Sequence, residues 1–262
     1  MTKHKLGLTL SGGGMCCAAQ IGVLKVFEEE GISPAIISGA SGGAIVGALY
    51  ANSIPCEEIL EVFKKVNPYS LNHFSPGKPG LFDIESYQVL EPYFPEDSFD
   101  ALNVPLIINA THLQKGITTY FSEGKLIKKI FASSAFPGLF APVNINNQLF
   151  SDGGILENLP TSIIRNRCEK LIAINVNVIP EVTSSSLSNT VKLMERAMRL
   201  VLSCQSTFRE EDCDLMIAPS EVAEHLLFSK SSIDKLYEIG YKEGKKMLPQ
   251  LKNYTPNQLG KN

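Results

Sequence analysis

The sequence predicts an α/β protein built on a mostly parallel sheet. Short apolar runs alternate with helical patterns in its first part, giving a strand over 6–10, a helix over 20–30, a strand over 35–38 and a small-residue helix over 42–52. Such a β-α-β-α opening is typical of parallel strands in one sheet. The chain has 262 residues, 44% of them apolar, and no internal repeat or linker, so we expect a single domain over 1–262.

The later elements follow from the same patterns. Gly31 fits the C-terminal cap of the first helix, and the stretch 67–81 is rich in Pro, Gly, Ser and Asn, which is typical of a long surface loop. The remaining predicted elements are helices over 56–66 and 83–90, strands over 106–111 and 116–121, a helix over 125–132, strands over 148–150 and 171–176, a mobile Ser-rich segment over 180–189, a helix over 191–208, a strand over 215–218 and a closing helix over 231–248.

Composition and charge exclude several classes of protein. A net charge of −3 gives no general affinity for nucleic acid. The six cysteines form no Cys-x-x-Cys pair and have no regular spacing, so we expect reduced thiols rather than a disulfide framework. No signal-peptide core precedes Ser11 and no apolar run reaches transmembrane length. We therefore expect a cytoplasmic protein, whose oligomeric state the sequence leaves open.

Ser41 stands in the pattern Gly-x-Ser-x-Gly, between Gly39 and Gly43. This pattern places a serine on a sharp turn from a strand to a helix, where small neighbours are required. The positive end of the helix dipole then lies beside the hydroxyl and stabilises developing negative charge. The pattern also occurs in ordinary glycine-rich turns, but the strand and helix predicted on either side favour a nucleophile.

A glycine cluster, Gly12, Gly13 and Gly14, follows the first predicted strand. Consecutive glycines allow backbone amides to approach an anion closely. A dinucleotide-binding turn does not fit, because Cys17 stands where its third glycine belongs, and a phosphate-binding P-loop lacks its Gly-Lys-Ser/Thr. A plain tight turn remains an alternative. Adjacent parallel strands would bring this cluster to the same sheet edge as Ser41, where it would serve as an oxyanion hole.

Asp152 follows a predicted strand and precedes Gly153 and Gly154. Taken alone, an aspartate in this setting is most often a turn or cap residue. The order Ser41, Asp152, His225 formally matches the triad of an α/β-hydrolase, but a glycine cluster just upstream of the serine is unlike that fold. No histidine has flanking residues that mark it as catalytic: His4, His73, His112 and His225.

Five segments together resemble the patatin-like phospholipases, particularly the small bacterial members. They are Leu-Ser-Gly-Gly-Gly at 10–14, Ile-Gly-Val-Leu at 21–24, Gly-Ala-Ser-Gly-Gly at 39–43, Ala-Ser-Ser-Ala-Phe-Pro-Gly at 132–138, and Asp-Gly-Gly-Ile-Leu-Glu-Asn-Leu-Pro at 152–160. The resemblance covers 6–160 and is less distinct beyond it. Because the motifs occur in order and with matching spacing, their combination is highly specific.

The resemblance implies a three-layer α/β/α fold and hydrolysis of fatty-acyl esters in phospholipids, lysophospholipids or related lipids, with no metal and no cofactor. It implies a Ser-Asp dyad without histidine, in which Ser41 is the nucleophile and Asp152 the base. An acyl-enzyme would form on Ser41 and water would release it. A non-catalytic lipid-binding or regulatory protein of the same fold is the alternative. The backbone amides that match the oxyanion hole are those of Gly12, Gly13, Gly14 and Met15.

The sequence departs from this family at one point. Relatives continue the glycine cluster with x-Arg-Gly or x-Lys-Gly, whereas this chain has Met15, Cys16 and Cys17. Loss of the basic residue predicts a preference for uncharged esters or lysolipids over intact anionic phospholipids. A basic residue from elsewhere, such as Lys78, would restore the charge.

The loop from Tyr69 to Phe82 predicts contact with a lipid surface. It carries five large apolar side chains among turn residues and could enter a membrane interface to a shallow depth, giving peripheral association. A loop that packs on its own domain is an equally good interpretation. The five side chains are Tyr69, Leu71, Phe74, Leu81 and Phe82.

Overall fold

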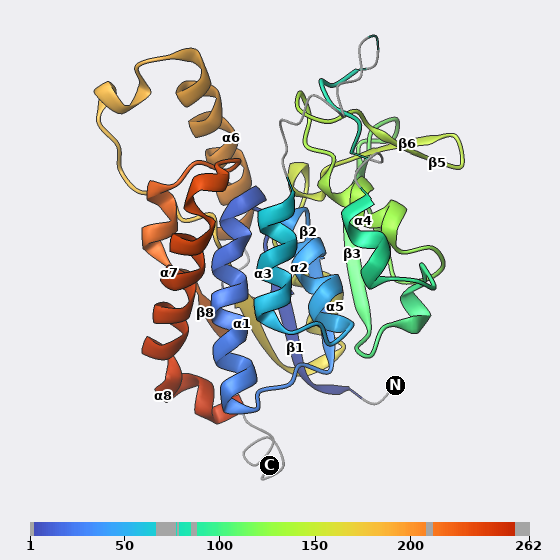
Figure 1. The fold of residues 1–262 in the computed structure, drawn as a ribbon, viewed down its shortest axis with the longest axis vertical. Helices are drawn as coiled ribbons and strands as arrows, with labels where there is room; N and C mark the ends of the chain where they lie inside the picture. The colour runs from blue at the N-terminus through green and yellow to red at the C-terminus, as the bar shows by residue number, and fades with distance from the viewer. Residues whose placement is uncertain (1–2, 67–76, 78, 85–87, 208–211, 255–262) are drawn as a thin grey trace.

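The protein is an α/β structure around one eight-stranded sheet (Figure 1). The computed structural model describes residues 3–66, 77, 79–84, 88–207 and 212–254. The strands follow the order β5-β6-β3-β2-β1-β7-β8, and β4 pairs with β3 beside this path. The first two strands lie next to each other near the centre of the sheet and are parallel.

Five neighbouring strands of the sheet are all parallel, and the last of them lies at an edge. They are β3 (Leu106–His112), β2 (Ile36–Ala40), β1 (His4–Leu10), β7 (Cys168–Ile174) and β8 (Leu215–Ile217). At one side, β4 (Ile117–Phe121) and β6 (Gln148–Ser151) pair antiparallel with β3, and β5 (Val143–Ile145) pairs antiparallel with β6. Parallel neighbours end at the same edge, so the turns after β1 and β2 lie together.

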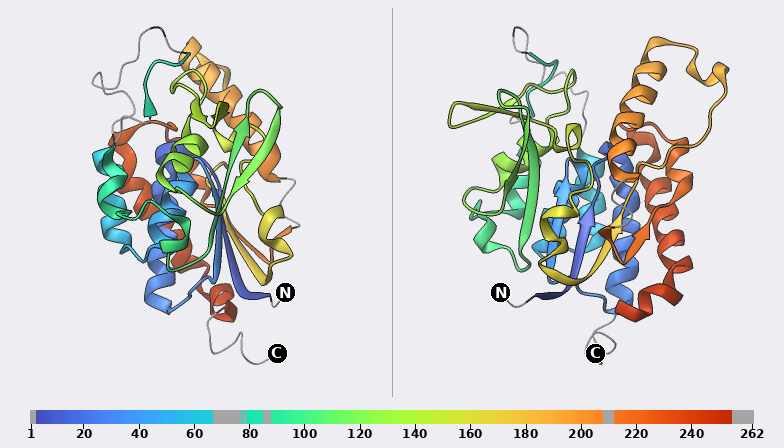
Figure 2. Two further views of the ribbon diagram at one scale, coloured as in Figure 1. Left: turned by 90° about the vertical axis from the view of Figure 1, so that its right-hand side faces the viewer. Right: turned by 180° about the vertical axis from the view of Figure 1, so that it is seen from behind.

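Helices cover both faces of the sheet, which confirms the predicted three-layer α/β/α fold (Figure 2). On one face lie α1 (Ala18–Glu30), α2 (Gly42–Ala51), α3 (Cys56–Lys65), α4 (Ile127–Ser134) and α7 (Ile233–Lys246). They bury most of the hydrophobic core. On the other face the short helix α5 (Ser162–Arg165) seals a small second cluster through Ile164. Helix α6 (Thr190–Thr207) rises near the carboxyl ends of the strands, and the short α8 (Leu248–Leu251) follows α7.

Helices α1 and α7 touch backbone to backbone. A Cβ on Gly240 would lie 1.8 Å from the carbonyl oxygen of Ala19, and a Cβ on Gly22 would lie 2.1 Å from the carbonyl oxygen of Tyr237. Only glycine fits at both positions, because any side chain would occupy the space of the opposing main chain. The C-terminal helix is therefore seated directly on the first helix of the chain.

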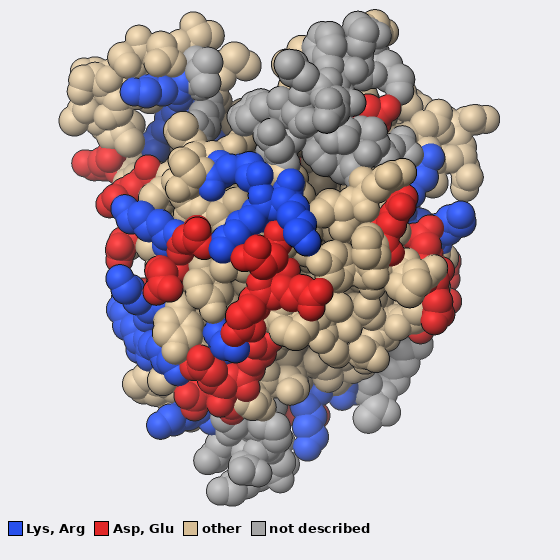
Figure 3. Space-filling model, viewed as in Figure 1, with Lys and Arg blue, Asp and Glu red and all other residues tan. Residues whose placement is uncertain are grey.

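The outer surface of these helices carries both signs of charge, closely mixed (Figure 3). Ion pairs join α1 to α3 through Lys25 and Glu57 at 2.5 Å, and α3 to α7 through Lys64 and Asp234 at 2.8 Å. On the part of this face that the structure describes, acidic side chains border the basic ones, so no continuous basic surface of the kind that binds a nucleic-acid backbone is formed. Among the helices in the described ranges, none is long and apolar enough to cross a bilayer.

The structure differs from the predicted elements in several places, among them the short elements β5 and α5, which were not predicted. The part of 83–90 that is described is not α-helical, because the turns there form the 3-10 helix η4 (Gln88–Tyr93) with Pro92 inside it. The first helix is preceded by a 3-10 turn, η1 (Gly14–Cys17). The segment 180–189, expected to be mobile, contains the 3-10 helix η7 (Ser184–Leu187).

Candidate active site

Ser41 occupies the sharp turn between β2 and α2. Its backbone has φ 52° and ψ −127°, a strained conformation that the surrounding structure must hold in place. The Ser41 amide donates a hydrogen bond to Ser133 Oγ at 2.9 Å. A Cβ on Gly39 would lie 2.6 Å from the carbonyl oxygen of Gly43, and a Cβ on Gly43 would lie 2.4 Å from that of Ser11. Close packing around the turn therefore requires both glycines of the motif.

Asp152 lies beside Ser41, in the turn that follows β6. Ser41 Oγ donates to Asp152 Oδ2 at 2.6 Å, and the Gly154 amide donates to Oδ1 at 2.8 Å. The main chain of Asp152 is also fixed: Thr111 Oγ1 donates to its carbonyl oxygen at 2.9 Å, and its amide donates to the carbonyl oxygen of Ala135 at 3.0 Å. The carboxylate is therefore oriented with one oxygen on the serine and the other on a backbone amide.

Burial changes the basicity of Asp152. The residue is 3% exposed, and loss of solvent raises the pKa of its carboxyl from the usual 3.8 to about 6, although hydrogen bonds from Ser41 and Gly154 act in the opposite direction. At neutral pH the group is ionised, yet it is more basic than an ordinary aspartate. This combination suits a carboxylate that accepts a proton from a hydroxyl.

Two amides of the glycine loop, which we define as residues 12–15, are already engaged. The Gly12 amide donates to the carbonyl oxygen of Asn158 at 3.0 Å, and the Met15 amide donates to the carbonyl oxygen of Leu227 at 2.7 Å. These bonds anchor the loop at both ends. They also leave neither of the two amides free for a ligand.

The amides of Gly13 and Gly14, between these anchors, donate no hydrogen bond to any residue that the structure describes. Both glycines line one small hollow together with Ser41 and Asp152. Gly14 has φ 55°, a left-handed conformation that glycine adopts at little cost. A hydroxyl, a carboxylate and two available amides therefore converge, as acyl transfer through a tetrahedral intermediate requires.

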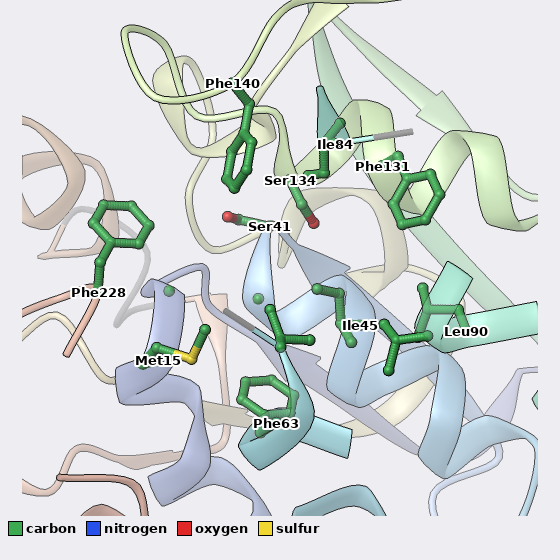
Figure 4. A pocket seen from close by; sticks show the side chains of 14 residues that line it. Met15, Ser41, Ile45, Phe63, Ile84, Leu90, Phe131, Ser134, Phe140 and Phe228 are labelled. Atoms are coloured by element: carbon green, nitrogen blue, oxygen red, sulfur yellow. The ribbon is translucent and has the colours of Figure 1, made fainter. Parts of the chain in front are cut away.

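An apolar pocket opens beside Ser41 and runs between α2, α3 and α4 (Figure 4). Its cavity volume is about 80 Å³. Within the described ranges, Ser41 and Ser134 contribute the only polar side chains of its lining, and no charged group faces it. Its walls are formed by Gly14, Met15, Gly42, Ile45, Phe63, Val66, Ile84, Val89, Leu90, Phe131, Phe140 and Phe228.

The described histidines do not join this group. The imidazole Nε2 of His225 is buried without a hydrogen-bond partner among the described residues, and burial lowers the pKa of that ring. His112 lies on β3 and packs edge-on against Phe150, with ring centroids 5.0 Å apart. His4 begins β1, at the opposite end of the strand from the glycine loop. His73 lies outside the described residues.

Several supporting residues were not singled out from the sequence. Ser133 and Asn158, which hold the serine turn and the glycine loop, both lie inside segments that carry the family resemblance, so a signal was present. Leu227 and Phe228 carry no such signal, because they lie far along the chain in a segment without a motif. Lys78, considered as a replacement cation, lies outside the described residues.

A family model described as Patatin-like phospholipase matches residues 8–164, more than half of the chain. The protein belongs to the patatin-like phospholipase family. The predicted family is thereby confirmed, and the matched segment contains both Ser41 and Asp152. In this patatin-like protein α6 and α7 lie beyond the matched residues.

Curated relatives of this patatin-like protein include fungal lysophospholipases. It is 28% identical over 284 residues to Lysophospholipase NTE1 of Coccidioides immitis, and 27% identical over 286 residues to Lysophospholipase nte1 of Aspergillus terreus. Both alignments cover 95% of this chain but 18% of the relative, so the chain spans less than a fifth of their length.

A solved structure supports the fold independently. The crystal structure of VipD from Legionella pneumophila matches with a TM-score of 0.54 and 15% sequence identity, over 95% of this chain and 67% of that chain. At this identity the likeness is one of fold.

Proposed function

We propose that this protein is a serine acyl hydrolase that cleaves fatty-acyl esters, with Ser41 as the nucleophile and Asp152 as its base. The observation that carries the proposal is the 2.6 Å hydrogen bond from Ser41 Oγ to Asp152 Oδ2 beside an apolar pocket. Family membership supports a lipid substrate. The names of the fungal relatives lead us to include lysophospholipids among the substrates.

In the acylation step, Asp152 Oδ2 takes the hydroxyl proton as Ser41 Oγ attacks the ester carbonyl carbon. The carbonyl oxygen becomes negative and accepts hydrogen bonds from the amides of Gly13 and Gly14. The N-terminus of α2, which begins directly after Ser41, adds a favourable dipole. Donors fixed in advance at this position lower the barrier because they need no reorganisation.

The intermediate then collapses. The bond to the alcohol breaks, and the leaving oxygen takes the proton from Asp152, so the acyl group remains on Ser41. In the second half, Asp152 takes a proton from water as the water oxygen attacks the acyl carbon. The bond to Ser41 Oγ breaks, the serine regains the proton, and a fatty acid leaves.

The apolar pocket supplies the binding energy for the acyl chain. Each buried methylene stabilises the complex by about 0.8 kcal/mol, and the lining that the structure describes offers no charged group with which a polar chain could pair. A head group would remain at the open side of the pocket. An ester with one long acyl chain fits this division into an apolar and an open side.

The geometry supports a dyad over a triad with His225. The Ser41 hydroxyl donates directly to the carboxylate, so no imidazole stands between them. His225 instead uses its carbonyl oxygen to accept a hydrogen bond from Arg199. The alternative of a non-catalytic lipid-binding protein would give no reason for a strained serine held against a basic carboxylate.

Purified protein tested on p-nitrophenyl acyl esters and lysophosphatidylcholine examines the proposal. We expect turnover by the wild type and labelling of Ser41 by a fluorophosphonate probe. Ser41→Ala should lose both without a change in melting temperature, and Asp152→Asn should lose most turnover. Ser122→Ala, a change at an exposed serine, is the matched control. A folded wild type that neither turns over nor is labelled would refute the proposal.

A further inference from the structure

Arg199 on α6 is buried to an unusual degree for a charged residue. It is 6% exposed, whereas its neighbours Leu200 and Val201 are 46% and 48% exposed. The usual arrangement of a helix is thus reversed, with the cation inward and apolar groups outward. A buried guanidinium is unfavourable unless it is held by polar partners, so its place in the structure needs a reason.

Two contacts of Arg199 reach the neighbourhood of the active site. Its Nη2 donates to the carbonyl oxygen of His225 and lies 3.8 Å from Cys16 Sγ. Cys16 belongs to η1, the turn into which the glycine loop runs. One side chain from α6 therefore touches segments that are separated from it by 183 residues on one side and 26 on the other.

These two segments, η1 and residues 225–227, adjoin the glycine loop. The Met15 amide donates to the carbonyl oxygen of Leu227, and the thiol of Cys16 points at the carbonyl oxygens of His225 and Leu226, at 3.8 and 3.9 Å. A guanidinium that binds both His225 and Cys16 links these two segments. Their spacing determines where the amides of Gly13 and Gly14 stand.

A second side chain of α6 also faces the active site. Leu202, one turn after Arg199, is buried and lines the small hollow that contains Ser41 and Asp152. It also approaches Gly154, whose amide orients the carboxylate: a Cβ built there would lie 2.9 Å from Leu202 Cδ2. The face of α6 that carries Arg199 and Leu202 therefore packs against the active site.

We infer that Arg199 supplies, from α6, the positive charge that the glycine motif of this chain lacks at Cys16. The inference rests on the proposed acyl-hydrolase function. Arg199 lies beyond the residues matched by the family model, in a part of the chain that carries no motif. It acts as a positioning residue, which holds the amides of Gly13 and Gly14 through Cys16 and His225 and adds a permanent positive charge behind the glycine loop.

The experiment places the cation back at position 16. Four variants are compared with the wild type: Arg199→Met, which keeps the volume without the charge; Arg199→Lys; Cys16→Arg/Arg199→Ala, in which the new side chain fills the vacated space; and Cys16→Arg alone. Arg196→Ala, one turn away on the same helix and bonded to the Pro180 carbonyl, is the matched control. The assays measure kcat and KM on a neutral p-nitrophenyl ester, and the melting temperature.

Arg199→Met should lower kcat roughly tenfold or more with little change in KM, because misplaced amides affect the transition state more than the bound ester. Arg199→Lys should retain an intermediate kcat. The double variant should recover at least half of the wild-type kcat, whereas Cys16→Arg alone should fall below the wild type, because two guanidinium groups then repel each other. Arg196→Ala should match the wild type.

Wild-type kcat in folded Arg199→Met overturns the inference. Failure of both Arg199→Lys and the double variant to exceed Arg199→Met also overturns it, because the charge would then be irrelevant. If Arg199→Met does not fold, the lysine and double variants decide alone. An inactive wild type refutes the proposed function instead, so the two failures are distinguishable.

Discussion

The amide of Ser41 donates to the hydroxyl of Ser133, which joins the strained serine turn to the last residues of α4. The neighbouring hydroxyl of Ser134 has no hydrogen-bond partner among the described residues and lines the apolar pocket. Two adjacent serines of one motif thus have different surroundings. One satisfies a buried amide of the elbow, and the other faces the space for substrate.

Ser133→Ala should therefore destabilise the protein and lower kcat. The change leaves the Ser41 amide buried without an acceptor, which costs about 1–3 kcal/mol, and it releases the turn from α4. Ser134→Ala is the control, since no described hydrogen bond is lost. Chemical denaturation and ester hydrolysis measure both effects. Equal stability of the two variants would contradict the role given to Ser133.

The rate of hydrolysis should rise with pH through about 6 and then level off. Asp152 must be ionised to accept the serine proton, and burial raises the pKa of its carboxyl to about 6. At pH 5 we expect kcat to be about a tenth of its value at pH 8. A stopped assay with a pH-insensitive ester product gives the profile. A rate that is constant from pH 5 to pH 8 would exclude Asp152 as the base.

Asp152→Asn should be more stable than the wild type at pH 8, although inactive. The pKa of this carboxyl is higher in the folded protein than the usual 3.8, so its stabilising effect is complete below that value and is lost as pH rises through about 6. Removing the charge should raise the free energy of unfolding at pH 8 by up to about 3 kcal/mol. The difference should shrink toward zero near pH 3.5. Denaturant titrations at the two pH values provide the test.

His225→Ala should retain most activity. Its ring has no described partner, and its contact with Arg199 uses the main-chain carbonyl, which alanine preserves. We expect kcat/KM within about threefold of the wild type. Loss as severe as that of Ser41→Ala in a folded variant would mean that a triad performs the chemistry.

The loop that was predicted to touch lipid lies largely outside the described residues, but its end is visible. Leu81 is 53% exposed, and its amide donates to the carbonyl oxygen of Leu139, next to Phe140 at the pocket. Phe82, in contrast, is buried. Leu81→Asp should weaken co-sedimentation with phosphatidylcholine vesicles more than Leu113→Asp, a change at the exposed β3–β4 turn. Equal binding of the two variants would remove this loop end from the interface.

The local parts of the site were accessible from the sequence, and the long-range parts were not. Ser41 and Asp152 each stand in a short glycine-bracketed motif. The topology of the sheet then brings Ser41 Oγ to 2.6 Å from Asp152 Oδ2. Arg199 contacts Cys16, directly after the glycine loop, and Leu227 contacts Met15 within it. Both contacts arise only because α6 and later segments fold back over the strand ends. No short sequence motif predicts that these later segments pack against the glycine loop.

In the small hairpin β5–β6, the second strand was predicted from the sequence but the first was not, for a different reason. Asn146 and Asn147 both have positive φ, at 52° and 62°, which is the conformation of a tight two-residue hairpin turn. Two consecutive asparagines between short apolar runs are a recognisable signal for it. The three-residue β5 was too short to stand out by alternation alone.

The contact of Gly22 with the backbone of α7 has a consequence for how this protein can be cut or recombined. The segment matched by the family model ends at residue 164, but the helix that covers α1 begins at Ile233. A fragment that stops where the family match stops would expose the glycine face of α1 and lose the carbonyl that anchors Met15. Chimeras between relatives should therefore exchange α1 and α7 as a pair. The part of the chain that must stay together extends to α7, well beyond the segment that the family model matches.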